Sequence, residues 1–257
     1  MCHTFSKSFL ISFCGEVASP HHTFTIIYNP SPDRIRKGIV FDKMKTLLSL
    51  FDYTGNWALP FAEAGWNVIL LDLKHTPDLF EYHKDINEVT ADYMYEYVFD
   101  NFETVDGILI AAPCTDFAGS GARWWKGKDE SGETELSIHL VRQSLRIVDI
   151  CMPDFWVLEN PVGRIHKLVP EIGKPKMYFN PCDFGEPYTK KTALYGYFNI
   201  SLKMNPVFPH EGSKMHKMYG GKSEKTKEMR SVTPMGFAYA FYEANKDYKS
   251  IQLSLNI

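Results

Sequence analysis

Cys114 is the side chain in this sequence whose type and position point most clearly to chemistry. It stands in the tripeptide Ala112-Pro113-Cys114, directly after the apolar run 107–111. The carboxyl ends of the strands line the ligand crevice in an open α/β sheet, and Pro113 restricts the backbone just before the thiol. We therefore expect Cys114 to face that crevice. The alternative is an inert buried thiol, because free Cys is among the most buried residue types.

A second chemical signal lies where the segment 50–56 turns from a predicted strand into a predicted helix. Gly55 lets the backbone approach a ligand, and the helix N-terminus offers unpaired N–H groups to a carboxylate or phosphate. Asp72 follows about twenty residues later, where an acidic side chain commonly accepts hydrogen bonds from ribose hydroxyls. The turn lacks the further glycines of the dinucleotide fingerprint, which favours a nucleoside cofactor such as S-adenosylmethionine. Asp72 as a helix cap or surface carboxylate is the alternative.

Alternating strands and helices are needed to position these residues. Strands are expected at 23–28, 45–50, 67–73, 105–111 and 155–158, and helices at 58–64, 91–101, 133–151 and 237–244. The long helix is amphipathic, and its apolar residues include Leu136, Leu140, Ile147 and Ile150. This alternation predicts an α/β fold with a doubly wound, mostly parallel sheet of Rossmann-like type. The segment 198–229 reads as a small irregular lobe.

Composition limits the classes of function that the chain can have. With 257 residues, 44% of them hydrophobic, it can bury a full core, and its net charge of −3 argues against coating nucleic acid by bulk charge. Five cysteines without short paired spacing indicate a reducing, intracellular setting and no zinc site. The apolar run 9–13 is too short for a signal peptide, and no run is long enough to span a membrane. A soluble, cytoplasmic protein is expected.

The order of motifs resembles the DNA (cytosine-5) methyltransferases, from about Leu47 to Tyr197 and again near Arg230. Residues 50–55 look like the family's cofactor loop, Ala112-Pro113-Cys114 is similar to its nucleophile motif, and Leu158-Glu159-Asn160 resembles its Glu-Asn motif. The resemblance implies the methyltransferase fold and S-adenosyl-L-methionine as cofactor, with Asp72 on the ribose and Asp85 on the adenine amino group. The implied cofactor site consists of Phe51, Asp52, Thr54, Gly55, Asp72, Asp85, Ile86, Pro113 and Ser231.

The family's mechanism explains why these residue types are needed. C5 of cytosine is a poor nucleophile, so a thiolate, here Cys114, adds to C6 and makes C5 able to accept a methyl group. Glu159 is the candidate that protonates or hydrogen-bonds N3, and Asn160 is expected to hold the loop that carries Cys114. Loss of the C5 proton and elimination of Cys114 complete the cycle without a metal. Alternatively, Glu159 is a surface residue at a strand end before Pro161.

Residues 118–128 follow the nucleophile motif and look like the family's closing catalytic loop. Three glycines indicate a mobile segment, and its charged side chains Arg123, Lys126 and Lys128 can meet phosphates. The pair Trp124-Trp125 can stack on bases or fill the space left by an extruded base. Docking of these tryptophans on the core is the alternative. Arg123 is the loop residue assigned to the catalytic set.

The sequence departs from the family pattern after residue 185. Lys190 falls on the first of two Arg positions, but Thr192 falls on the second, which contacts the cytosine ring in the family; Lys191 is a possible substitute. The stretch 198–229 is too short for a usual target-recognition domain. It carries the basic residues Lys203, His210, Lys214, His216, Lys217, Lys222, Lys225 and Lys227. We expect this basic lobe to meet the phosphate backbone with little sequence readout.

These observations predict a small cytosine C5 methyltransferase acting on duplex or single-stranded DNA, with a protein partner as a possible source of specificity and no membrane association. The expected division is a segment of unknown role (1–44), a catalytic core (45–197), a reduced recognition lobe (198–229) and a C-terminal helix that completes the cofactor site (230–257). Two alternatives stay open. One is the same chemistry on RNA or a free pyrimidine nucleotide, and the other is a non-catalytic cofactor-binding subunit.

Overall fold

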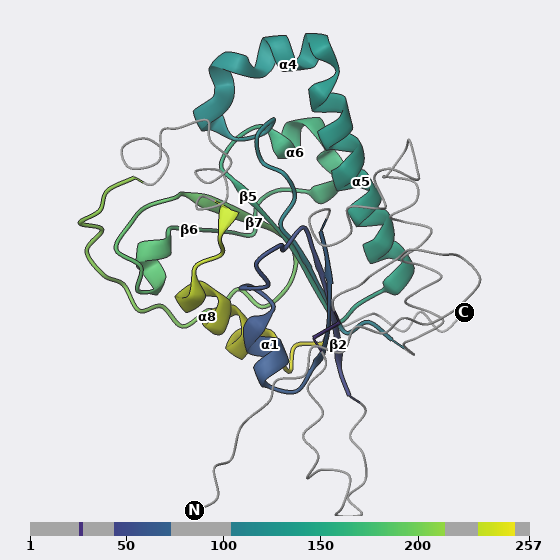
Figure 1. Ribbon diagram of the computed structural model, residues 1–257, viewed down its shortest axis with the longest axis vertical. Helices are drawn as coiled ribbons and strands as arrows, with labels where there is room; N and C mark the ends of the chain where they lie inside the picture. The colour runs from purple at the N-terminus through teal and green to yellow at the C-terminus, as the bar shows by residue number, and fades with distance from the viewer. Residues whose placement is uncertain (1–25, 28–43, 73–103, 214–230, 250–257) are drawn as a thin grey trace, which may run out of the picture.

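A computed structural model describes residues 26–27, 44–72, 104–213 and 231–249, and their strands form one sheet between helices (Figure 1). The strands are β1 (Ile26–Ile27), β2 (Thr46–Leu50), β3 (Asn67–Leu71), β4 (Gly107–Ile110), β5 (Phe155–Pro161), β6 (Met177–Phe179) and β7 (Thr192–Tyr197). The helices are α1 (Leu59–Glu63), α4 (Trp125–Ser131), α5 (Glu133–Cys151), α6 (Ile165–Leu168) and α8 (Met235–Asn245). Three short 3₁₀ helices are η2 (Gly119–Trp124), η3 (Pro170–Ile172) and η4 (Pro181–Phe184).

The sheet has a parallel centre and antiparallel edges. Its order is β1-β3-β2-β4-β5-β7-β6, and β3, β2, β4 and β5 run parallel. Each of β2, β3 and β4 is buried along its whole length, as expected for parallel strands covered on both faces. The antiparallel strand β7 and its neighbour β6 were not anticipated, because their short runs of mixed residues carry little periodic signal.

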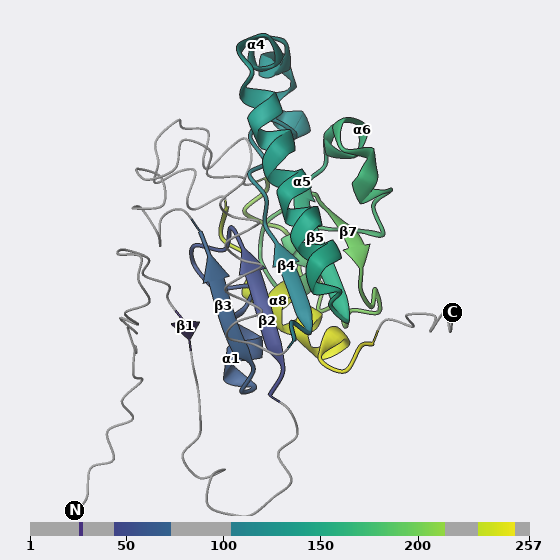
Figure 2. The ribbon, with the colours of Figure 1, turned by 90° about the vertical axis from the view of Figure 1, so that its right-hand side faces the viewer.

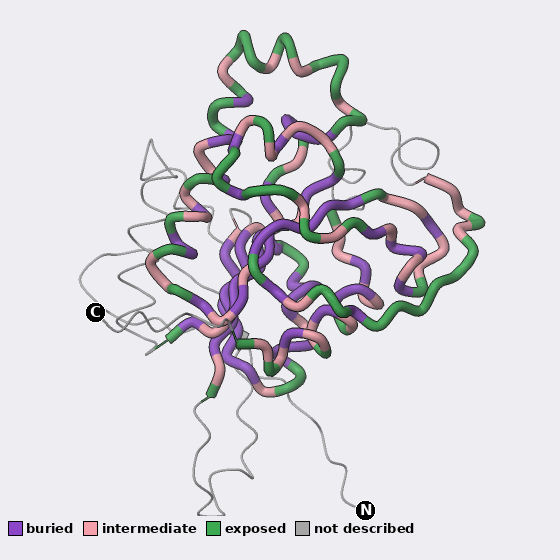
Figure 3. The backbone as a smooth tube through the Cα atoms, turned by 180° about the vertical axis from the view of Figure 1, so that it is seen from behind, coloured by how far each residue is buried: buried purple, intermediate pink, exposed green. Residues whose placement is uncertain are grey.

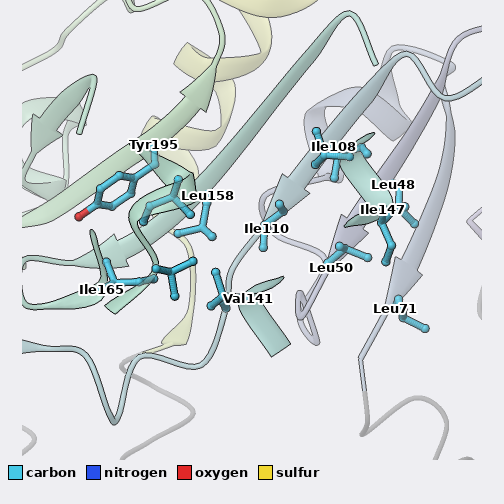
Figure 4. Close-up of a cluster of buried hydrophobic side chains, with 14 of the residues drawn as sticks. Leu48, Leu50, Leu71, Ile108, Ile110, Val141, Ile147, Leu158, Ile165 and Tyr195 are labelled. Atoms are coloured by element: carbon cyan, nitrogen blue, oxygen red, sulfur yellow. The ribbon is translucent and has the colours of Figure 1, made fainter. Parts of the chain in front are cut away.

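Helices cover both faces of this sheet, which confirms the predicted doubly wound α/β fold. Side chains alternate along the strands, so Leu48 and Ile69 belong to one cluster with Val141 of α5 on one face, and Figure 4 labels Leu48 and Val141 of this cluster. Their neighbours Leu47 and Val68 join Phe61, Phe237 and other residues of α1 and α8 on the opposite face. Figure 1 shows α5 on one side of the strands and α1 and α8 on the other.

The buried stripe of α5 differs from the predicted one, although the bounds of the helix are those expected. Leu136 is 63% exposed, while Ile138, Val141 and Val148 are buried against the sheet. The prediction for Leu136 was wrong because the buried face of α5 passes through positions 134, 137, 138 and 141, and Leu136 lies outside that face. Ile147 is buried as predicted.

The strand order reverses between β2 and β4, the two strands at the middle of the sheet (Figure 2). From β2 the chain continues to β3 on one side, and the next described strand, β4, lies on the other side. Ligands of open α/β sheets bind outside the carboxyl ends of the strands at such a reversal. The turn after β2 and Cys114 after β4 both begin at this point.

Residues 198–213 contain no helix or strand and run over the surface beside η4, where Figure 3 shows mostly exposed and half-buried backbone. The predicted helix 91–101 and the second half of the basic lobe, residues 214–229 with six of its eight basic residues, lie outside the described residues. The division of the chain into domains therefore stays a prediction. Within the described ranges, no helix has both the length and the apolar character that a membrane span requires.

Candidate active site

The loop after β4 presents Cys114 at the carboxyl end of the sheet. Ala112 is buried, Pro113 is exposed and Cys114 is half-buried, so the thiol lies at the boundary between core and surface. The backbone turns immediately: the amides of Phe117 and Ala118 donate to the carbonyl oxygen of Cys114 at 3.1 and 2.9 Å. This tight turn fixes the direction in which the chain leaves the nucleophile position.

Asn160 connects β5 to that loop, as the sequence predicted. Its side-chain amide nitrogen donates to the carbonyl oxygen of Ala112 at 3.3 Å, two residues before Cys114. Asn160 is fully buried, and its other amide atom, Oδ1, has no hydrogen-bond partner within the described part of the chain. Since β4 pairs with β5 only from Gly107 to Ile110, this contact continues the link between β5 and the chain beyond the end of β4.

A short bridge between residues 118 and 163 joins the two loops a second time. The amide of Gly119 donates to Val162, and that of Arg164 donates to Phe117, each at 2.9 Å. The backbones approach so closely that a Cβ at Gly163 would lie 1.8 Å from the Phe117 carbonyl oxygen. Only glycine fits here, so the sequence Asn-Pro-Val-Gly after Glu159 serves this approach.

Glu159 and Lys190 form an ion pair inside a small pocket. Their side chains are 18% and 10% exposed, and Lys190 Nζ lies 3.6 Å from Glu159 Oε1. The pocket is lined by Glu159, Phe179, Pro181, Lys190, Thr192, Thr233, Pro234 and Phe237. The structure thus brings together the predicted Glu, the predicted cation and the segment before α8.

Thr192 and Lys191 do not supply the second cation of the family pattern. Thr192 is buried, and its hydroxyl donates to the backbone carbonyl of Lys190 at 2.9 Å. Lys191 is exposed, with its ammonium 5.7 Å from the centroid of the Tyr178 ring. Lys190 is therefore the cation that lines this pocket.

The turn after β2 is built on unusual backbone conformations. Phe51 and Gly55 have positive φ angles, 63° and 68°, and the non-glycine outlier marks a strained position of the kind found at functional sites. Asp52 stabilises the turn from within, because its buried carboxylate accepts hydrogen bonds from the Ser49 hydroxyl at 3.1 Å and the Ala58 amide at 3.4 Å. Burial raises the pKa of Asp52 above its usual range.

Asp72 lies beside this turn, half-buried at the end of β3. The two are close, because the Phe51 amide donates to Leu71 at 2.7 Å and the charge of Asp72 also raises the pKa of Asp52. A carboxylate beside a strained turn at the sheet's reversal point fits the ribose of a nucleoside cofactor. Thr54 and Ser231 are exposed, and Asp85 and Ile86 lie outside the described residues.

The segment after Cys114 is helical, where an irregular, glycine-loosened loop was expected. Residues 119–131 form η2 and α4, which stand beyond the end of the sheet (Figure 1). Lys128 forms an ion pair with buried Asp116, and its contact with phosphate stays a prediction. Arg123 and Trp124 are exposed at the tip, the guanidinium 5.0 Å from the ring centroid.

Sequence reasoning missed Asp116 and Arg164, which organise this segment. Asp116 accepts hydrogen bonds from Lys128 and from Ser137 of α5. Arg164 donates to the Asp116 backbone and to the Asp129 carboxylate. A carboxylate two residues after the nucleophile and an Arg four residues after Asn160 were available signals, but nothing local indicated their partners.

Comparison with known proteins assigns this arrangement to the methyltransferases. Residues 45–168 match the family model described as C-5 cytosine-specific DNA methylase. This segment, which holds the turn after β2, Cys114 and the Glu159-Asn160 pair, is similar to that family over just under half of the chain.

Individual relatives are distant. A candidate type II methyltransferase of Methanocaldococcus jannaschii is 28% identical over 137 residues, which cover 48% of this chain and 34% of the relative. A DNA modification methyltransferase encoded within an Escherichia coli prophage gives a TM-score of 0.42 at 19% identity, covering 64% of this chain and 53% of its own. The Entamoeba histolytica methyltransferase EhMeth gives 0.41 at 14%, covering 65% and 57%. The matched part spans about a third of the curated relative's length.

Proposed function

We propose that this protein transfers a methyl group from S-adenosyl-L-methionine to C5 of cytosine in DNA through a covalent adduct between Cys114 and C6. The observation that carries the proposal is the hydrogen bond from Asn160 to Ala112. It ties the strand end that bears Glu159 to the loop that bears Cys114, and both motifs lie in the segment that matches the family model.

Each residue has a role that its surroundings support. Cys114, half-buried after a rigid Pro113, adds to C6. Glu159 hydrogen-bonds or protonates N3 as charge develops on the ring, and the ammonium of Lys190 at 3.6 Å from its carboxylate holds it in the pocket. Asn160 keeps the two loops in register.

The cofactor is proposed to bind at the turn after β2. Phe51 and Gly55 shape the turn, Asp52 holds it from within, and Asp72 accepts hydrogen bonds from the ribose. Thr54, Pro113 and Ser231 have exposed positions that suit contacts with the same ligand. When bound, S-adenosyl-L-methionine supplies the methyl group through its sulfonium.

DNA is the proposed substrate because the exposed tip beyond Cys114 carries Arg123 and Trp124 side by side. A guanidinium suits phosphate, and an exposed indole suits stacking on a base or filling the gap left by an extruded base. RNA and free pyrimidine nucleotides present the same ring to Cys114. The substrate is therefore varied in the experiment below.

Covalent trapping tests the nucleophile directly. DNA containing 5-fluorocytosine cannot lose a C5 proton, so wild-type protein with S-adenosyl-L-methionine should accumulate an adduct detected by mass spectrometry, whereas Cys114→Ser should form none. Cys151→Ser is the matched control, because burial raises the pKa of the Cys151 thiol to about 11 and the residue lies at the end of α5. Adduct formation by Cys114→Ser would refute the assignment. Equal adduct formation with RNA or with a mononucleotide that contains 5-fluorocytosine would contradict DNA as the specific substrate.

Calorimetry tests the cofactor site separately. Asp72→Ala should weaken binding of S-adenosyl-L-methionine by about ten-fold or more, since it removes charge-assisted hydrogen bonds worth roughly 1.5–3 kcal/mol. Asp149→Ala, on the exposed side of α5, is the control that should leave affinity unchanged. Unaltered binding by Asp72→Ala would place the cofactor elsewhere.

A further inference from the structure

Arg164 makes an unusual number of contacts for a residue outside the known motifs. Its Nε donates to the Asp116 carbonyl oxygen at 2.9 Å, and its two terminal nitrogens donate to the two carboxylate oxygens of Asp129 at 2.8 and 2.7 Å. One of these nitrogens also donates to the Thr134 hydroxyl at 3.0 Å. The guanidinium lies 4.5 Å from the centroid of the Trp125 ring. One side chain thus contacts four points of the segment that follows Cys114.

These four points enclose the whole projecting part of that segment. Asp116 lies two residues after Cys114, Trp125 and Asp129 lie at the start and in the second turn of α4, and Thr134 lies in the first turn of α5. The backbone of Arg164 adds a fifth contact, because its amide donates to Phe117 at 2.9 Å. Arg164 therefore joins the base of the projection, α4 and the start of α5 to the loop after the strand that carries Asn160.

The chemistry of the contact requires arginine. A planar guanidinium fits a carboxylate through two parallel hydrogen bonds and at the same time stacks on an aromatic ring, which the point charge of lysine cannot reproduce. The Arg164 side chain is 11% exposed, whereas Asp129 is 47% exposed. Hydrogen bonds from Arg164 hold the pKa of Asp129 down at about 2. The ion pair therefore connects the largely buried side chain of Arg164 to the solvent-exposed helix α4 that carries Asp129.

We infer that Arg164 is a positioning residue that latches segment 116–134 and thereby sets where Cys114 and the Arg123–Trp124 tip lie relative to each other. The inference rests on the proposed function for its effect on methyl transfer, while the latch itself is a property of the fold. Segment 116–134 follows Cys114 directly and carries the Arg123–Trp124 tip. Removing the two hydrogen bonds from Arg164 to Asp129 releases α4 from the end of the sheet and leaves Cys114, Glu159 and the cofactor turn unaltered.

The test uses Arg164→Lys, which keeps the charge and loses the fork, and Asp129→Asn, which removes the exposed carboxylate and leaves the buried anchor. Amide hydrogen exchange in peptides covering 119–131 should become about ten-fold faster in both variants. Arg142→Lys is the control, because Arg142 on the exposed side of α5 pairs with Glu171 through a single Nε hydrogen bond at 3.1 Å and does not contact segment 116–134 in this way. Wild-type exchange rates in Arg164→Lys and Asp129→Asn would overturn the latch.

The second readout is kinetic. The same two variants should form the 5-fluorocytosine adduct about ten-fold more slowly and show a lower kcat, with an unchanged affinity for S-adenosyl-L-methionine. The double variant should be no slower than Arg164→Lys alone, since both changes break one contact. Faster exchange with wild-type adduct kinetics would overturn the positioning role. Absence of any adduct in wild-type protein would refute the proposed function, and hydrogen exchange would still decide the latch.

Discussion

Two surface segments of this protein are attached to the core in different ways. The nucleophile segment, residues 112–134, is held by the side chains of Asn160 and Arg164 as well as by backbone hydrogen bonds at Gly119 and Arg164, and within it Lys128 reaches Asp116. The lobe segment, residues 198–213, is held at its start by the side chains of Asn199 and Asn245 and further along by its backbone. Its amides at positions 205, 207 and 211 donate to carbonyl oxygens at positions 183, 182 and 187 at 2.8–2.9 Å.

The two kinds of attachment differ in how strongly they depend on residue type. Side-chain contacts depend on single residue types, so the geometry around Cys114 is fixed and is sensitive to substitution. Backbone contacts depend on no particular side chain, which leaves the lobe segment free to display varied residues, and Phe208 is 81% exposed there. The proposed chemistry is built on the first segment.

The largest expected effect is at Gly163. Gly163→Ala brings a Cβ to 1.8 Å from the Phe117 carbonyl oxygen, so the backbone of one loop must shift. We expect a loss of about 3 kcal/mol in the free energy of unfolding, measured by urea denaturation, together with loss of activity. Gly127→Ala, on α4 with no atom within 4 Å of the new Cβ, should be neutral or slightly stabilising. Equal effects at the two glycines would contradict the account.

An intermediate effect is expected at Asn160. Asn160→Ala removes the hydrogen bond to Ala112 in a buried site and should cost about 1–2 kcal/mol in the free energy of unfolding. It should also speed amide exchange in residues 112–118, because the loop loses its link to β5. Exchange confined to β5, with the Cys114 loop unaffected, would show that Asn160 stabilises its own strand alone.

The lobe segment should respond to its backbone and hardly to its side chains. Val207→Pro deletes the amide that donates to Cys182 at 2.8 Å and should cost about 1 kcal/mol or more. Phe208→Ser, at the neighbouring exposed position, should change the free energy of unfolding by less than about 0.5 kcal/mol. Chemical denaturation of both variants compares them, and a larger loss from Phe208→Ser would reverse the comparison drawn above.

The smallest effect concerns pH. The pKa of Asp129 lies at about 2 because Arg164 donates to its carboxylate, so the ionised form is favoured in the folded protein. The latch is therefore complete above the ordinary Asp pKa of about 4 and weakens as pH falls from there through about 2. A carboxyl-carbon NMR titration should give this midpoint for wild type and a higher one for Arg164→Lys. The same ordinary midpoint in both proteins would argue against the ion pair.

The sequence predicted the positions that follow buried parallel strands and little of what lies between them. Apolar runs located β2, β3 and β4, and hence Cys114 and Asp72, because fully buried strands have nearly continuous hydrophobic sequence. Asn160's contact was predicted from the family resemblance. Strand β7 was not predicted, because its antiparallel pairing with β5, in which Leu194 lies opposite Glu159, leaves no periodic signal in the sequence. The contact between Lys190 and Glu159 depends on this pairing, so the sequence did not explain it.

The helical conformation of residues 119–131 could not be predicted from the local sequence. Glycines at 119, 121 and 127 indicated a loose loop, yet these residues form η2 and the start of α4. What favours helix there is the set of long-range contacts from Arg164 and Asp116, and such tertiary contacts override local propensity. The roles of Asp85, Ile86 and the lysines at 214, 217 and 222 stay predictions, because these residues lie outside the described ranges.

The central proposal, that this protein methylates C5 of cytosine in DNA with Cys114 as the nucleophile that adds to C6, is tested most directly by nucleoside mass spectrometry. DNA is purified from cells that lack cytosine methylation and express wild-type protein or Cys114→Ser at equal levels, with Cys151→Ser as control. The account predicts 5-methylcytosine with wild type and Cys151→Ser and none with Cys114→Ser. Absence of 5-methylcytosine with wild-type protein, or equal amounts with Cys114→Ser, would contradict it.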